Sequence, residues 1–199
     1  MQKQFKEEFE AIMDYYLKER GRRPMFQNEA LDICKNAYHS VDLKTIDWIR
    51  GMGSDACHRL RNIGSHLAGK RFGFDLNRVG KYGWLEHPDF LGVEEIAFKL
   101  PVELYMYNHI EVGHGPNMKW TFATCMSYSI GCSSYALGIF NRVCDSREDA
   151  IQQASEELID IIRRTQKGKY LPKSDYPYLE RILSMIDSYN ASRKQLTLF

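Results

Sequence analysis

The spacing of apolar residues changes along this chain, and that change limits the folds that the chain can adopt. Residues 3–20 place Phe5, Phe9 and Ile12 at intervals of four and three between charged residues, which predicts an amphipathic helix. Similar stripes fill the rest of the first third and return near the end of the sequence. The middle, residues 102–140, is instead rich in aromatic and other residues that favour strands. The order of these patterns predicts an α+β fold.

Local signals place the individual elements of this fold. Apolar periodicity, N-cap residues and Gly or Pro stops predict helices at 3–20, 27–38, 43–50, 55–66, 146–165 and 176–189. Strands are expected at 102–107, 120–128 and 135–140, as an antiparallel three-strand meander with a turn at Gly131 to Ser134. Alternation over residues 71–76 also predicts a short strand.

These elements suggest four segments in the chain of 199 residues. Residues 1–70 form a helical unit that looks like a helix-turn-helix, and 71–100 form a connector. Residues 101–189 form a small α+β unit that ends in helices. The polar stretch that begins at Asn190 is expected to be a flexible tail over residues 190–199.

Composition excludes several classes of protein. With 44% hydrophobic residues, 27% charged residues and only 6 prolines, the chain is expected to fold rather than stay disordered. It has no apolar run of bilayer length and no apolar core of a signal peptide, so we expect a cytoplasmic protein without a membrane partner. Its 5 cysteines form no CxxC pair and are interpreted as reduced thiols. No glycine-rich nucleotide-binding loop is present, and we expect no cofactor.

The most specific motif is Gln195-Leu196-Thr197-Leu198-Phe199. It resembles the pentapeptide by which bacterial DNA polymerases and mismatch-repair proteins bind the sliding clamp, commonly Gln-Leu-Ser/Asp-Leu-Phe. The resemblance implies that Leu198 and Phe199 fill an apolar pocket of the clamp, with Leu196 in a shallower one and the amide of Gln195 at the rim. Thr197 is the only departure from the pattern. The alternative is that these apolar residues fold back onto the protein's own core.

A second signal lies in residues 43–63, where two short predicted helices flank a turn with Gly51 and Gly53. The surrounding segment 50–81 has seven basic residues and two acidic ones. Helix geometry predicts an outward polar face suited to phosphates and base edges, with Lys70, Arg71 and the following strand as a wing. The candidate DNA-binding residues are Arg50, Ser54, His58, Arg59, Arg61, Asn62, Lys70 and Arg71. The alternative is an ordinary solvated helix face.

Residues 120–158 resemble, at the level of pattern, a small β-β-α module of uncharacterised proteins of bacterial plasmids, phages and integrated elements. The shared features are an aromatic strand around Trp120 and Tyr128, a Gly/Ser turn, a further strand and a helix that starts at Ser146. This resemblance implies a mobile-element setting and assigns no reaction.

An enzymatic alternative rests on His109, Glu111 and His114. On a strand, His109 and Glu111 point to the same face, which is a start for a metal or nuclease site. No further cluster follows at ligand spacing, so the primary expectation is that these residues are polar side chains of a hairpin and that no metal is bound.

The sequence therefore predicts a non-enzymatic, DNA-associated accessory protein that binds the sliding clamp, with double-stranded DNA as a second partner. Two alternatives stay open at this point. One is a DNA-processing enzyme, such as a nuclease, that the clamp recruits. The other is an interaction protein or inhibitor that occupies the clamp groove.

Overall fold

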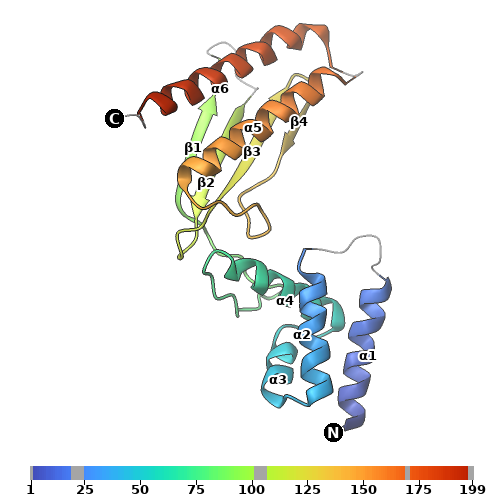
Figure 1. Cartoon of the computed structure of the whole chain (residues 1–199). Coiled ribbons are helices and arrows are strands. Elements are labelled where there is room, and N and C mark those ends of the chain that lie inside the picture. Colours follow the sequence, from blue (N-terminus) through green and yellow to red (C-terminus); the bar gives the residue numbers. More distant parts are fainter. Residues whose placement is uncertain (1, 19–24, 101–106, 169–170, 197–199) are drawn as a thin grey trace. The chain divides into compact units, whose positions relative to one another are not determined.

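The computed structural model describes residues 2–18, 25–100, 107–168 and 171–196 (Figure 1). The chain divides into two units, Met1–Asp89 and Phe90–Phe199, each of which is described here by itself. Together the units contain helices and one antiparallel sheet, which confirms the α+β class. Within the described ranges, no helix combines the length and apolar character needed to cross a bilayer.

The first unit consists of helices α1 (Gln2–Lys18), α2 (Gln27–Ser40), α3 (Leu43–Gly51) and α4 (Ala56–Lys70). All four were predicted near these positions. Asp42 caps α3 by accepting the backbone N–H of Thr45 at 3.2 Å, and Asp55 caps α4 by accepting that of His58 at 2.9 Å. Apolar side chains from every helix form one core: Ile12, Leu31, Ile46, Ile49, Leu60 and Ile63.

The predicted strand at 71–76 is wrong, because this segment pairs with no strand among the described residues. It begins with a turn and continues without regular secondary structure. The alternation that suggested a strand is real, since Phe72, Phe74 and Leu76 are buried and the residues between them are exposed. The buried side chains pack on α4 instead of on a sheet, and His66 Nδ1 donates to the carbonyl oxygen of Leu76 at 2.8 Å. The expected wing therefore does not form.

The second unit is built on an antiparallel sheet with the strand order β1-β2-β3-β4. The strands are β1 (Leu91–Phe98), β2 (Asn108–His114), β3 (Trp120–Tyr128) and β4 (Gly131–Ser134). Helices α5 (Arg147–Gln166) and α6 (Tyr176–Leu196), joined through the short 3-10 helix η1 (Lys173–Asp175), cover one face of this sheet (Figure 1). The core between sheet and helices includes Ile110, Val112, Phe122, Met126, Ile151, Leu158 and Ile182.

The sheet differs from the predicted three-strand meander in three places. Strand β1 lies in the segment that was expected to be a connector. The predicted strand 102–107 lies almost wholly outside the described residues, and the pairing strand is β2. The predicted turn at Gly131 to Ser134 is strand β4, and 135–140 is not a strand. The turn comes earlier, between β3 and β4, where Asp175 accepts both the backbone N–H of Ser129, at 3.0 Å, and its hydroxyl, at 2.5 Å.

One ion pair ties the sheet to the start of α5. Arg147 Nε and Nη2 donate to the two carboxylate oxygens of Glu94 at 2.7 and 2.6 Å. This bidentate contact holds the pKa of Glu94 below its usual range, against the opposing effect of burial. The same end of α5 is capped by Ser146, whose hydroxyl accepts the backbone N–H of Asp149 at 3.0 Å, as the sequence predicts.

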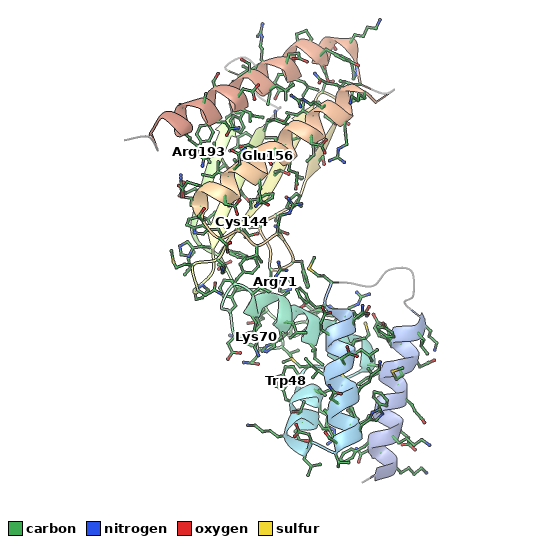
Figure 2. The ribbon with its side chains drawn as sticks, viewed as in Figure 1. Trp48, Lys70, Arg71, Cys144, Glu156 and Arg193 are labelled. Carbon is green, nitrogen blue, oxygen red and sulfur yellow. The ribbon has the colours of Figure 1, made fainter. Side chains whose placement is uncertain are left out.

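Helix α6 continues to Leu196, beyond its predicted end at residue 189. Two side chains hold this extension to α5. Ser155 donates to Asn190 Oδ1 at 3.2 Å. Arg193, which is labelled in Figure 2, donates through Nη2 to the carbonyl oxygen of Glu148 at 3.2 Å. The segment that was expected to be a flexible tail from Asn190 onward is helical up to Leu196. The two contacts with α5 stabilise these added turns.

Candidate functional site

Most of the predicted DNA-binding residues make contacts inside the first unit. Arg50 donates to both carboxylate oxygens of Glu8 at 3.1 Å and to Asp47 at 3.2 Å, and its guanidinium lies over the ring of Phe5. Arg59 donates to the carbonyl oxygen of Gly53 at 2.9 Å. Arg61 donates to the hydroxyl of Tyr15 at 2.9 Å. These three arginines fasten α1, α3 and α4 to one another and to the α3–α4 turn.

Asn62 is the clearest departure from the predicted outward face, because its side chain is only 1% exposed. Its Nδ2 donates to the carbonyl oxygens of Met52 at 2.6 Å and Gly83 at 2.8 Å. Its Oδ1 accepts the backbone N–H of Leu85 at 3.0 Å. The prediction that Asn62 faces outward is wrong. The residue fastens the loop of residues 80–85 to α4, a contact that helix geometry alone does not show.

The other four predicted residues differ in their exposure. Ser54 and Lys70 are exposed, whereas Arg71 is packed over the rings of Phe26 and Phe72. Lys70 and Arg71 are labelled in Figure 2. Burial lowers the pKa of Arg71. His58 is partly buried. Its ring Nδ1 lies 2.8 Å from Asp55 Oδ2. The pKa of Asp55 is lowered mainly by the hydrogen bond from the backbone N–H of His58 and then by the contact with the His58 ring.

The loop of residues 80–85 carries side chains that the sequence reading placed in a connector. Trp84 is 42% exposed and lies against the His58 ring, with 4.2 Å between ring centroids. Tyr82 is 74% exposed, and Lys81 Nζ lies 4.7 Å from its ring centroid. The loop can lie close to the His58 ring because residue 83 is a glycine. Gly83 has a φ of +82°, and a Cβ at this position would lie 2.8 Å from the ring. Exposed aromatic rings beside a lysine are suited to stacking on nucleic-acid bases.

The second unit has a cluster of possible metal ligands on the sheet face opposite α5 and α6. His109 and Glu111 project to this face, because the alternate residues Ile110 and Val112 enter the core below the helices. Glu95 of β1 is directly opposite Glu111 in the register. One ligand atom of each of these three residues lies within 4.8 Å of the others. We call Glu95, His109 and Glu111 the sheet-face triad.

The triad differs from the predicted set in one member. His114 does not join it, because its Nδ1 contacts the carbonyl oxygen of Gly115 at 2.9 Å and its ring packs on Trp120 with centroids 4.8 Å apart. Glu95 takes its place. Sequence reasoning missed Glu95 because it lies in the unpredicted strand β1, and only the pairing of β1 with β2 brings it to His109 and Glu111.

Part of this sheet face is covered by the segment after β4. Asn141 Nδ2 donates to the carbonyl oxygens of Phe122 and Ala136 at 3.1 and 3.0 Å, and Thr121 donates to that of Arg142 at 2.8 Å. Leu137 reaches Gly113. The triad retains access to solvent, since Glu95 is exposed and the other two members are partly buried.

The third candidate is the pentapeptide 195–199. Backbone helix is described for Gln195 and Leu196, and the remaining motif residues Thr197, Leu198 and Phe199 lie outside the described residues. The motif begins two positions after Arg193, the last residue whose side chain is seen to hold α6 to α5.

Comparisons with protein-family models, curated proteins and solved structures found no match to this chain.

Proposed function

We propose that this protein is a DNA-associated accessory protein of a bacterium or of a mobile genetic element, and that residues 195–199 bind the replication sliding clamp. The observation that carries the proposal is the sequence Gln195-Leu196-Thr197-Leu198-Phe199, which keeps four positions of the clamp-binding pattern. Two apolar anchors flanked by a glutamine amide suit a short peptide that binds in an apolar groove.

The end of α6 is compatible with such binding. Binding of the motif as an extended peptide requires it to leave the helix, and the terminal residues of a helix fray at little free-energy cost. The described part of the motif, Gln195 and Leu196, is helical, and Arg193 can stay bonded to Glu148 while these two residues unwind. Clamp binding therefore requires no rearrangement of the described core.

The test is calorimetric titration of the full chain with a purified bacterial sliding clamp. We expect a micromolar dissociation constant, about 8 kcal/mol, because a short peptide must order when it binds. The double variant Leu198→Ala/Phe199→Ala should lose binding, and its melting temperature should stay nearly unchanged. Thr197→Ala is the matched control, since the pattern is loosest at that position, and it should bind like the parent.

Two outcomes would contradict the proposal. The first is the absence of clamp binding at tens of micromolar. The second is a large fall in the melting temperature of the double variant, which would place Leu198 and Phe199 in the protein's own core.

We further infer that the first unit contacts duplex DNA in the manner of a helix-turn-helix protein. The support is the basic excess of segment 50–81, together with the exposed Lys70, Lys81, Tyr82 and Trp84. Arg50, Arg59 and Arg61 are occupied by internal contacts, so the proposed phosphate contacts shift to the exposed lysines.

This DNA contact has a salt dependence that can be measured. Each phosphate contact contributes about −0.9 to the slope of log affinity against log salt concentration. The variant Lys70→Ala/Lys81→Ala should therefore flatten that slope by about 2 if both lysines contact phosphates, measured by fluorescence anisotropy with a labelled duplex. Lys3→Ala/Lys6→Ala on the exposed face of α1 is the control and should leave the slope unchanged. Equal slopes in the parent and the Lys70/Lys81 variant would exclude these contacts.

A further inference from the structure

We propose that the sheet-face triad, Glu95, His109 and Glu111, binds a divalent first-row transition-metal ion such as Zn²⁺ or Mn²⁺. This site lies in the second unit and is independent of the proposed clamp and DNA contacts. Three features point to this site: the strand register, an imidazole nitrogen without a partner among the described residues, and the chemistry of the donor atoms.

The register places two like charges face to face. Glu95 and Glu111 are direct partners across the antiparallel pair of β1 and β2. Like charges at such positions repel and destabilise a sheet. Among the described residues, no lysine or arginine forms an ion pair with either carboxylate, whereas the neighbouring Glu94 is paired with Arg147. A bound cation would offset the repulsion between Glu95 and Glu111.

His109 has an incomplete set of hydrogen bonds. Its Nδ1 is shielded from solvent and has no hydrogen-bond partner in the described part of the chain. Its ring packs against Tyr107, with centroids 4.5 Å apart, which limits the orientations that the ring can adopt. A shielded polar atom without a partner is uncommon in proteins, and an ion or water that completes the site is one established reason for it.

The donor set selects the kind of metal. One imidazole nitrogen and two carboxylates suit Zn²⁺ and Mn²⁺, whereas Mg²⁺ and Ca²⁺ prefer oxygen ligands alone. Metal–ligand bonds of about 2.0–2.2 Å bring tetrahedral ligand atoms to about 3.4 Å from one another. The ligand atoms of the triad lie within 4.8 Å of one another, and rotation of the exposed Glu95 side chain can shorten their separation to the distance that a metal requires. Three protein ligands leave at least one position open to water or substrate.

A neighbouring thiol is excluded from the proposed ligand set. Cys125 is opposite His109 on β3, and its Sγ donates to the carbonyl oxygen of Tyr107 at 3.6 Å. Burial first, and then the nearby Cys132 and the triad carboxylates, raise the pKa of Cys125. Its Sγ is also not among the ligand atoms that lie within 4.8 Å of one another, so the geometry leaves Cys125 out of the proposed set.

The experiment is calorimetric titration of the full, reduced chain with Zn²⁺, Mn²⁺ and Mg²⁺ separately. We expect one Zn²⁺ or Mn²⁺ per chain and much weaker binding of Mg²⁺. His109→Gln and Glu111→Gln should each weaken binding at least tenfold. His114→Gln, which changes a histidine of the same strand outside the triad, and Cys125→Ser should each keep the parental affinity.

Thermal unfolding without metal separates loss of the site from loss of the fold. Glu111→Gln removes one of two opposed charges, so the metal-free variant should melt at or above the parental temperature while it gains no stabilisation from Zn²⁺. The proposal is overturned if His109→Gln binds Zn²⁺ like the parent, if Cys125→Ser abolishes binding, or if the parent binds none of the metals.

Discussion

Replacing Leu158 with alanine is expected to lower the free energy of unfolding by about 2–5 kcal/mol. Leu158 lies on α5, is fully buried, and belongs to the core that joins the helices to the sheet. The substitution removes apolar surface from the core and leaves a cavity that neighbours such as Ile110 and Ile182 can fill only in part. Urea unfolding, followed by the fluorescence of Trp120 in the same unit, measures the effect.

Leu91→Ala is the matched control for this prediction. Leu91 starts β1 and is 49% exposed, so its truncation should change the unfolding free energy by about 0.5 kcal/mol or less. Equal effects of the two substitutions would mean that α5 does not pack on the sheet as described.

The second large effect is expected for Asn62→Ala, at about 2–4 kcal/mol. The substitution removes three hydrogen bonds and leaves the buried backbone N–H of Leu85 without an acceptor. Asn62→Asp should be at least as damaging, because it keeps the acceptor but loses both donors and brings a charge into a buried site. Urea unfolding followed by the fluorescence of Trp48 and Trp84 reports on the first unit.

The control is Asn36→Ala, on the exposed surface of α2, which should change stability by about 0.5 kcal/mol or less. The same experiment also tests the loop of residues 80–85. If Asn62 fastens that loop, Asn62→Ala should increase amide hydrogen exchange at Gly83 and Leu85, whereas Asn36→Ala should not. Unchanged exchange at both positions would contradict the described hydrogen bonds.

The helices could be predicted from the sequence because the helical signal is local. In α3 and α4, for example, the caps Asp42 and Asp55 and the apolar spacing all lie within a few residues of one another. Strand β1 has no comparable signal: its residues Leu91 and Val93 are exposed, and burial becomes marked only at Phe98. Its pairing with β2 depends on residues distant in sequence, so Glu95 could not be predicted as a member of the triad.

The same limit applies to the first unit. Helix geometry correctly placed Leu60 and Ile63 in the core. It could not show that a later loop covers Asn62, because that contact joins α4 to residues Gly83 and Leu85. Arg50 and Arg61 were predicted as DNA contacts for the same reason: their partners Glu8 and Tyr15 lie on α1, far away in sequence.

The division of the chain into two units bears on how strong the DNA contact has to be. The clamp motif belongs to the second unit, whereas the basic helices belong to the first. A clamp encircling DNA would hold the first unit beside the duplex at an effective concentration on the order of millimolar. In the proposed function, a DNA affinity that is weak but measurable in the isolated protein is therefore sufficient once the clamp is bound. Local concentration, rather than recognition of a base sequence, would then determine where the protein acts.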